Sequence, residues 1–479
     1  SHAASAFFPS PFNESAFITV DGVGEWSTSS IGIGRNNKIE LIHDIQFPHS
    51  LGLLYSAFTY YSGFRVNSGE YKLMGLAPYG EPIYKDLIYK HLIDVKADGS
   101  FRMNMSYFNY CHGLTMTNQK FHKLFSGQPR KPESNLTQKE MNLACSIQIV
   151  LEETMIKIAK HTKKITGMKK LCMAGGVALN CVANGKLLRS ELFDDIWIQP
   201  AAGDAGGAIG CALFTWYQYL NNERSTDNVN DSMHGAYLGP KFKNSTIKTF
   251  LNERNYPFVE LSDEELPLII ADLIGHGKVI GWFQGRMEFG PRALGSRTII
   301  ADSRSSKMQK ILNQKIKFRE SFRPFAPSIL AEKISDYFDI DRESPYMLLV
   351  GYIKEDKQIK MSENEKNYFG LKKLNVVRSE FPAITHVDYS ARVQSVNRKT
   401  NIRYHQMISQ FYKKFGSPII VNTSFNVRGE PIVCSPEDAY LCFMRTGMDY
   451  LIIGNYLLKK SNQKPLSNDT DWHNQFELD

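Results

Sequence analysis

Two stretches of the sequence repeat one order of features that strongly limits the fold. The stretches "KKLCMAGGVALNCVANGKL" (169–187) and "IWIQPAAGDAGGAIGCALFTWYQYL" (196–220) each pass from a short apolar run through a Gly-Gly pair into a second apolar run. This order is typical of a strand, a glycine turn and a helix. Two such units in succession predict an α/β domain in which the ends of the strands converge on a cleft.

The length predicts two domains, with a third left open, because 479 residues are too many for one ordinary core. The first domain is predicted at 1–220, a polar linker at 221–235, the second domain at 236–460 and a loosely held tail at 461–479. Strands are predicted at 16–20, 31–33, 278–283, 346–353 and 417–425, with a closing apolar segment at 448–460. Helices are predicted at 49–62 and 140–165.

Composition excludes several classes of protein. Hydrophobic residues make up 42% of the chain and charged residues 22%, as in a folded globular protein. No apolar stretch approaches the roughly 18 residues that span a bilayer, and no secretory signal is recognised, so a cytoplasmic location is expected. The seven cysteines include no C-x-x-C pair, which argues against a disulfide framework and a thiolate zinc site. A net charge of +8 is compatible with binding either nucleic acid or a phosphorylated ligand.

The two glycine pairs are candidate ligand contacts. Gly175 and Gly176 are predicted where a strand ends and a helix begins, which lets a backbone approach an anion closely; simple packing is the alternative. Gly206 and Gly207 follow Asp204, an acid suited to hold a metal ion or a ribose hydroxyl. The alternative for Asp204 is that it caps the following helix.

Arginines and lysines are interleaved with Gly, Pro and Phe in one region of the second domain. Arginine on a rigid loop suits bidentate recognition of phosphate or carboxylate, whereas a solvated basic face is the alternative interpretation. The residues concerned are Arg286, Arg292, Arg297, Arg304, Lys315, Lys317, Arg319 and Arg323. Further along, a polar pocket for a small oxyanion or amide is predicted from Arg392, Asn422, Ser424, Asn426 and Arg428.

Eight motifs in order give the chain a family resemblance. They are "SHAASAFFPSPF", "VDGVGEW", "KLMGLAPYG", "AGGVALNCVANG", "GDAGGAIG", "EFGPRALGSR", "FRPFAP" and "NTSFN". With them the sequence resembles the O-carbamoyltransferases of antibiotic and nodulation-factor biosynthesis, the family that includes the tobramycin carbamoyltransferase. The resemblance implies an actin-like ATPase (ribonuclease H-like) domain followed by a YrdC-like α/β domain.

The resemblance also implies a reaction. The second domain would use carbamoyl phosphate and ATP to form a carbamoyl-adenylate with release of pyrophosphate. The first domain would transfer the carbamoyl group to a hydroxyl of a small-molecule acceptor at a divalent metal, Fe²⁺ by resemblance, with Mg²⁺ accompanying ATP. Neither a membrane nor nucleic acid is an expected partner, and a homodimer is left open.

The resemblance assigns residues to each site. His2, Asp21 and Asp204 match metal ligands, and two imidazoles with two carboxylates suit a first-row divalent ion. The nucleotide cleft of the first domain is matched by Gly175, Gly176, Asn180, Gly206 and Gly207. The carbamoyl phosphate and adenylate pocket is matched by Arg292, Lys317, Arg323, Arg392 and Ser424, to which Arg319 is added on chemistry alone.

The sequence departs from the family pattern at its start. The pattern has a further histidine four residues before His2, and an H-D-S-type phosphate loop earlier still. We expect the native protein to be longer than these 479 residues, or a second chain to supply the missing part. Two other functions compete with the carbamoyltransferase: a tRNA threonylcarbamoyl transferase-like enzyme, and a non-catalytic nucleic-acid-binding or scaffold protein.

Overall fold

The computed structural model describes residues 1–466 and Trp472, and its chain divides into two compact units. Unit 1 consists of Ser1–Met233 with Phe369–Lys373, and unit 2 of His234–Tyr368 with Leu374–Asp479. The division between them falls inside the predicted linker 221–235, and most of the predicted tail 461–479 lies outside the described residues. No helix in the described part of the chain is long and apolar enough to cross a bilayer.

Unit 1 is built on a mixed five-stranded sheet with the order β3-β2-β1-β6-β7. The first three strands are antiparallel, whereas β1, β6 and β7 are parallel. The strands are β1 (Glu14–Val20), β2 (Ser27–Arg35), β3 (Lys38–Gln46), β6 (Lys170–Ala174) and β7 (Asp195–Ile198), with a separate hairpin of β4 (Ile93–Val95) and β5 (Phe101–Met103). The helices are α1 (His2–Phe7), α2 (Leu51–Tyr61), α3 (Glu70–Leu76), α4 (Lys85–His91), α5 (Gln119–Leu124), α6 (Gln138–Thr166), α7 (Cys181–Arg189) and α8 (Asp204–Leu213).

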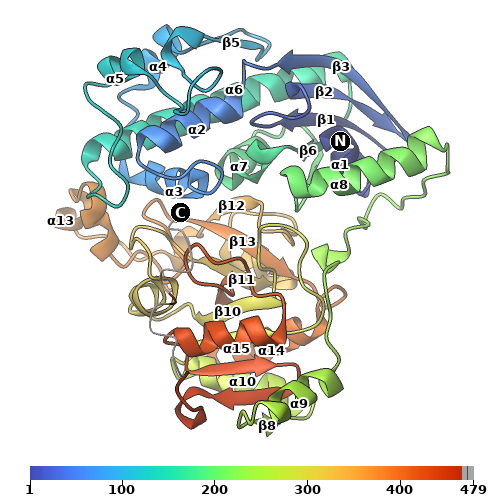
Figure 1. Cartoon of the computed structure of the whole chain (residues 1–479), viewed down its shortest axis with the longest axis vertical. Helices are drawn as coiled ribbons and strands as arrows, with labels where there is room; N and C mark the ends of the chain where they lie inside the picture. The colour runs from blue at the N-terminus through green and yellow to red at the C-terminus, as the bar shows by residue number, and fades with distance from the viewer. Residues whose placement is uncertain (467–471, 473–479) are drawn as a thin grey trace. The chain divides into compact units, whose positions relative to one another are not determined.

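Helices cover both faces of this sheet, with α6 and α7 on one face and α1 and α8 on the other (Figure 1). The sequence predicted α6 well because its ends carry strong signals. Thr137 and Glu140 form a capping box at its start, and Gly167 ends it in the left-handed conformation with φ of 65°. Strand β3 was not predicted, because its exposed sequence "KIELIHDIQ" lacks a clear alternation of apolar and polar residues.

Unit 2 is built on a nine-stranded mixed sheet with the order β12-β13-β11-β14-β10-β9-β15-β16-β8. The strands are β8 (Val259–Glu260), β9 (Ile280–Phe283), β10 (Arg297–Asp302), β11 (Ala326–Leu330), β12 (Leu349–Tyr352), β13 (Ser390–Val396), β14 (Ile419–Ser424), β15 (Tyr450–Ile453) and β16 (Tyr456–Lys459). The helices are α9 (Asn244–Glu253), α10 (Glu265–Gly275), α11 (Met308–Ile311), α12 (Ile334–Tyr337), α13 (Glu363–Lys366), α14 (Ile402–Phe415) and α15 (Pro436–Arg445).

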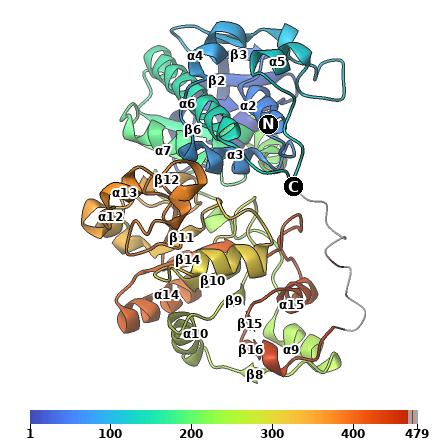
Figure 2. The ribbon, with the colours of Figure 1, turned by 90° about the vertical axis from the view of Figure 1, so that its left-hand side faces the viewer.

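Two apolar cores lie on opposite faces of the unit 2 sheet. One core joins α10 and α14 to Trp282 and Ile420, and the other joins α9 and α15 to Ile299 and Val421. Figure 2 shows these helix pairs on the two sides of the strands. Both units are therefore mixed α/β layers, which confirms the predicted class of fold.

Arg224, in the predicted linker, is held firmly by hydrogen bonds. The buried guanidinium of Arg224 donates hydrogen bonds to five backbone carbonyl oxygens, those of Phe7, Phe8, Ser10, Phe12 and Asn36. Burial without a carboxylate partner lowers the pKa of Arg224. The chain after α8 is therefore fastened to the segment that follows α1.

Replacing Arg224 by Met is expected to destabilise unit 1 by about 3 kcal/mol, because several buried carbonyl groups lose their donor at once. Thermal unfolding and amide exchange over residues 7–12 would measure the loss. Arg35→Met is the control, because Arg35 is exposed and its contact with Glu14 is 3.6 Å long. Equal stability of the Arg224 and Arg35 variants would contradict the anchoring role.

Candidate functional site

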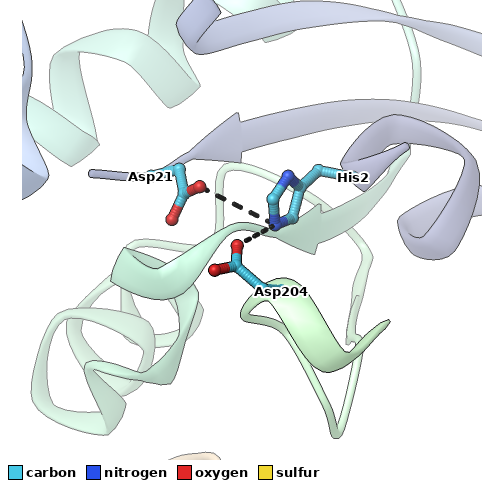
Figure 3. A group of neighbouring side chains, drawn as sticks. All are labelled: His2, Asp21 and Asp204. Carbon is cyan, nitrogen blue, oxygen red and sulfur yellow. Dashed lines mark ion pairs between the residues drawn. The ribbon is translucent and has the colours of Figure 1, made fainter. Parts of the chain in front are cut away.

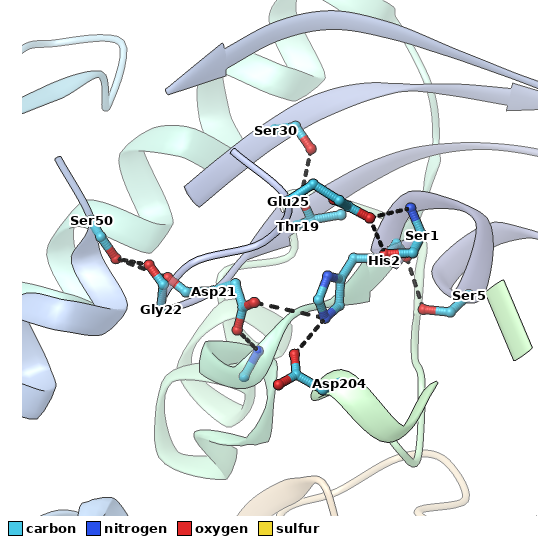
Figure 4. A network of polar contacts seen from close by, with 11 residues as sticks. Ser1, His2, Ser5, Thr19, Asp21, Gly22, Glu25, Ser30, Ser50 and Asp204 are labelled. Carbon is cyan, nitrogen blue, oxygen red and sulfur yellow. Dashed lines mark hydrogen bonds and ion pairs between the residues drawn. The ribbon is translucent and has the colours of Figure 1, made fainter. Parts of the chain in front are cut away.

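The carboxyl ends of the parallel strands in unit 1 carry the first group of predicted site residues. Asp21 directly follows β1, and its Oδ1 accepts a 2.8 Å hydrogen bond from the backbone N–H of Gly176, which follows β6. The hydroxyl of Ser50 donates to the carbonyl oxygens of Asp21 and Gly22 at 3.0 and 2.6 Å (Figure 4). Ligands of α/β sheets commonly bind at such strand ends. The convergence of strand ends that the repeated units predicted is therefore present.

Close packing of α1 against α8 brings the other two predicted ligands to the same place. A Cβ at Gly210 would lie 2.1 Å from the carbonyl oxygen of Ser1, so only glycine permits this approach. His2 begins α1 and Asp204 begins α8. The Nε2 of His2 lies 3.8 Å from Asp21 Oδ2 and 4.0 Å from Asp204 Oδ1 (Figure 3).

The three side chains fit a divalent metal ion. One ligand atom from each of His2, Asp21 and Asp204 lies within 4.8 Å of the others, and this is the only such group of three or more among the described residues. The Nε2 of His2 is buried and has no hydrogen-bond partner in the described part of the chain. Asp204 does not cap α8, because Gly203 occupies the cap position and the Asp204 side chain is 94% exposed. An imidazole and two carboxylates are suitable ligands for Fe²⁺ and similar ions.

A cavity of about 580 Å³ opens beside these ligands within unit 1. Asp21, Asp204, Gly176 and Asn180 line it, so it includes two of the five residues predicted to bind a nucleotide. Asn180 is held rigidly: its amide pairs with that of Gln148 at 3.0 and 3.1 Å. The volume is in the range of small-molecule sites.

The remaining three predicted nucleotide contacts, Gly175, Gly206 and Gly207, do not line this cavity, and close packing explains the glycine at two of these positions. Gly175 has φ of 94°, and a Cβ there would lie 2.2 Å from the carbonyl oxygen of Val20. Gly206 and Gly207 were predicted in a turn but lie inside α8. A Cβ on Gly206 would lie 2.1 Å from the carbonyl oxygen of Ala201. The structure therefore gives Gly175 and Gly206 a steric reason to be glycine.

The two neighbouring glycines of α8 allow a direct comparison. Gly206→Ala is expected to destabilise the chain by about 2 kcal/mol, because the new methyl group meets backbone. Gly207→Ala is expected to stabilise the chain by up to about 1 kcal/mol, because alanine favours a helix over glycine and the nearest neighbour of its Cβ would lie 3.7 Å away. Chemical denaturation would compare the two variants, and equal losses would refute the steric explanation.

One face of the unit 2 sheet carries two of the residues predicted to bind carbamoyl phosphate and the adenylate, Arg392 and Ser424. Side chains two residues apart on a strand share a face. Along one face of β14 the side chains therefore change from apolar to polar, from Ile420 through Asn422 to Ser424. The side chains on the same face of β13 likewise change from apolar to polar, from Val396 through Gln394 to Arg392. The face is thus apolar under α10 and α14 and polar at its other end.

The loop that bears Arg292 is bound to this polar end. Asn422 Nδ2 donates to the carbonyl oxygen of Ala293 at 3.0 Å, and Gln394 Nε2 donates to that of Leu294 at 2.7 Å. Glu288 holds the same loop through the backbone N–H groups of Leu294, Ser296 and Arg297. The structure therefore brings the Arg292 loop over the face that carries Arg392 and Ser424.

Lys317 is one of the buried cationic residues of unit 2. Its Nζ donates hydrogen bonds to the carbonyl and hydroxyl oxygens of Ser424 and to the carbonyl and side-chain oxygens of Asn426. Burial, with the nearby charges of Arg319 and Arg323, lowers the pKa of Lys317 well below its usual value. The charges of Arg319 and Arg323 next to Lys317 outnumber the nearby carboxylate of Glu430, and this balance favours an anionic ligand.

Asn313 arranges the loop that carries the two arginines. It is buried at the π-helical turn Leu312–Lys317, where its Oδ1 accepts from Arg319 Nε at 2.8 Å. Its Nδ2 donates to the carbonyl oxygen of Arg323 at 3.4 Å. The guanidinium of Arg319 also lies 4.7 Å from the centroid of the Phe325 ring. Asn313 was not predicted as a site residue, because a single asparagine among lysines carries no recognisable spacing.

Two of the arginines predicted to bind an anion serve the fold instead. Arg297 is fully buried on β10, its guanidinium stacks on Phe283 at 3.6 Å, and it donates to the carbonyl oxygens of Gln284 and Gly285, among others. Neighbouring residues of a strand point to opposite faces of the sheet, and Thr298 lies on the same face as Asn422. Arg297 therefore lies on the face opposite to Arg392. Arg304 forms an ion pair with Asp302 at 2.7 Å. The motif did not reveal that a strand begins at Arg297.

Both units match one protein family. Residues 1–213 match the family model described as Carbamoyltransferase N-terminus, and residues 271–460 match Carbamoyltransferase C-terminus. The chain belongs to the carbamoyltransferase family. This confirms the resemblance that the ordered motifs predicted.

Three relatives cover nearly the whole carbamoyltransferase chain. Nodulation protein NolNO of Sinorhizobium fredii is 36% identical over 98% of this chain and 64% of its own length. Nodulation protein NolO of Bradyrhizobium diazoefficiens is 37% identical over 96% of this chain and 78% of its own. An uncharacterized protein of Synechocystis is 58% identical over the whole of this chain and 78% of its own length. The chain thus spans between 64% and 78% of the length of these relatives.

Proposed function

We propose that the chain is an ATP-dependent O-carbamoyltransferase with two sites. At the unit 2 site, carbamoyl phosphate, ATP and one water give carbamoyl-adenylate, pyrophosphate and phosphate. At the unit 1 site, the acceptor hydroxyl displaces AMP from the carbamoyl carbon and forms an O-carbamoyl product. The observation that carries the proposal is the cation group around Lys317 in one unit together with the His2, Asp21 and Asp204 group in the other.

The unit 2 residues support the first step. Both substrates are anionic, and arginine binds phosphate oxygens through paired hydrogen bonds. Arg319 and Arg323 are placed by Asn313, while Lys317 fixes the end of β14 at Ser424. An adenylate hydrolyses readily in water, so the site must exclude further water once the intermediate has formed.

The unit 1 residues support the transfer step. His2, Asp21 and Asp204 would hold the divalent ion, and the ion would supply Lewis-acid activation of a carbonyl or hydroxyl oxygen. The N–H of Gly176 fixes the Asp21 carboxylate, and the Asn180–Gln148 amide pair forms a rigid wall of the cavity.

The domain folds implied by the resemblance are part of the proposal. In unit 1 three antiparallel strands continue into two parallel ones in the order β3-β2-β1-β6-β7, which supports an actin-like, ribonuclease H-like domain. The mixed sheet of unit 2 with its cation group supports a YrdC-like domain.

The test is mass spectrometry of candidate acceptors incubated with the chain, carbamoyl phosphate, ATP, Mg²⁺ and Fe²⁺. The expected result is the gain of one carbamoyl group by a hydroxyl compound, dependent on both ATP and carbamoyl phosphate. Modification of tRNA in the presence of threonine and bicarbonate, with no such product, would contradict the proposal.

A further inference from the structure

Unit 1 contains a second cavity, of about 340 Å³, between its sheet and α6. The end of β1 with parts of β2 and β3 forms one wall, Ile158 and His161 of α6 form another, and the turn between β4 and β5 closes a third side. The described residues that line it are all different from those that line the larger cavity beside Asp21 and Asp204. The second cavity is therefore separate from the candidate metal site, and its volume is enough for a small molecule.

The turn that closes this cavity is firmly placed. Gly99 has φ of 84°, and a Cβ there would lie 2.4 Å from the backbone nitrogen of Ile158, so the turn packs directly against α6. Oδ1 of Asp98 accepts hydrogen bonds from the backbone N–H and the hydroxyl of Ser100 at 2.9 and 2.7 Å. The carboxylate of Asp98 is thus fixed at the cavity before any ligand binds.

Ser29 of β2 places an unpaired hydroxyl in the sheet wall of the cavity. The residue is 5% exposed, and its Oγ has no hydrogen-bond partner in the described part of the chain. Buried hydroxyl groups in proteins are nearly always hydrogen-bonded. The neighbouring hydroxyls of Thr19 and Ser30 satisfy this rule by pairing with each other at 2.5 Å (Figure 4). Ser29 therefore has a hydrogen bond left to make with a ligand.

The fixed charges of this cavity are negative. The carboxylates of Asp44 and Asp98 line it, and no lysine or arginine does so among the residues that the structure describes. The hydrogen bonds from Ser100 lower the pKa of Asp98, so this carboxyl group is ionised at neutral pH. Its Oδ2 accepts no hydrogen bond from the described residues. A ligand with an ammonium group is favoured by this lining over one with a carboxylate.

The rest of the lining is aromatic and apolar. The imidazole rings of His43 and His161 lie with their centroids 6.1 Å apart and their planes 28° from parallel. The apolar side chains are Ile31, Ile45 and Ile158. Such a surface suits the flat faces of an aromatic ring. Among the described residues, no three ligand atoms from the imidazoles and carboxylates here lie within 4.8 Å of one another, so the lining suits an organic molecule better than a metal ion.

We propose that this cavity binds a small hydroxylated arylalkylamine, that is, an aromatic ring with a hydroxyl group and a side chain that ends in an ammonium group. Oδ2 of Asp98 accepts a hydrogen bond from the ammonium group, and the Ser29 hydroxyl bonds to the hydroxyl group of the ligand. The ring packs among the imidazoles and the isoleucines. Binding at this cavity needs neither ATP nor carbamoyl phosphate, so it stands whether or not the chain transfers a carbamoyl group.

Three small molecules test the site: tyramine, phenethylamine and 3-(4-hydroxyphenyl)propionate. Phenethylamine lacks the hydroxyl group of tyramine, and the propionate carries a carboxylate in place of the ammonium group. Ligand-observed NMR titrations in EDTA measure their affinities for the full chain. We expect tyramine to bind about tenfold more tightly than the propionate. We expect it to bind about fivefold more tightly than phenethylamine, which leaves Ser29 unpaired.

Two variants assign the contacts to the cavity. Asp98→Asn should weaken tyramine binding about fivefold or more, because the amide can still accept from Ser100 but carries no charge. Ser29→Ala should bring the affinities of tyramine and phenethylamine to within about twofold of each other. Asp98 is exposed, so its variant keeps the test valid if Ser29→Ala does not fold.

Two further variants are controls. Asp94→Asn is the matched one, because Asp94 is an exposed aspartate of the same hairpin that pairs with Lys96 and does not line the cavity. Asp204→Asn changes the larger cavity instead. Both should bind tyramine as the wild type does.

Three results would overturn the assignment: no detectable binding of tyramine, equal affinities for tyramine and the propionate, or wild-type affinity for tyramine in Asp98→Asn. Loss of tyramine binding in Asp204→Asn would also overturn it, because the amine would then occupy the larger cavity.

Discussion

Replacing Arg323 by Ala is expected to lower carbamoyl-phosphate-dependent release of pyrophosphate by about 100-fold or more. Arg323 lies close enough to Lys317 to lower its pKa, and Asn313 holds its backbone carbonyl oxygen. Its guanidinium would pair with phosphoryl oxygens at the point where negative charge must be balanced, and a methyl group cannot do so. A coupled pyrophosphate assay at saturating ATP measures the rate.

Arg398→Ala is the control for this variant, since Arg398 is an exposed arginine of the same unit. Its rate should equal that of the wild type. Arg323→Lys should recover only part of the activity, because lysine keeps the charge and loses the paired hydrogen bonds. Pyrophosphate release at the wild-type rate in Arg323→Ala would remove Arg323 from the proposed site.

Asp204→Asn is expected to weaken divalent-ion binding by about 100-fold or more while leaving the fold unchanged. The Asp204 side chain is exposed and makes no described hydrogen bond, so the substitution removes a charge and little else. Co²⁺ absorption and anaerobic Fe²⁺ titration measure the affinity, and circular dichroism checks the fold.

Asp86→Asn provides a matched control for the metal site. Asp86 is likewise an exposed aspartate in the first turn of a helix of unit 1, but it lies in α4 and away from His2. Its variant should bind the ion as the wild type does. Equal affinity of the Asp204 and Asp86 variants would show that Asp204 is not a ligand.

Local signals in the sequence were sufficient to predict many of the strands and the long helix of unit 1. The apolar runs at β1, β2, β6 and β7 and the capped helix α6 were predicted because short-range patterns specify them. The order of the strands was not predictable, because pairing joins residues more than a hundred positions apart, as for Phe17 and Cys172. The position of the α8 start depended on packing against α1, which no local pattern reveals.

Individual site residues could be predicted only where they lie close together in the sequence or belong to a family motif. His2, Asp21 and Asp204 are far apart in the sequence, and the resemblance alone joined them. Arg297 was misassigned because the sequence does not show which face of a strand a side chain occupies until its partners are known.

Rapid-quench mass spectrometry would detect the carbamoyl-adenylate that the chain is proposed to make. The chain is mixed with ATP and ¹³C-labelled carbamoyl phosphate without acceptor. We expect labelled carbamoyl-adenylate and pyrophosphate in equal amounts, formed only when both substrates are present. Conversion of ATP to ADP, or release of pyrophosphate with no labelled adenylate, would contradict the proposed function.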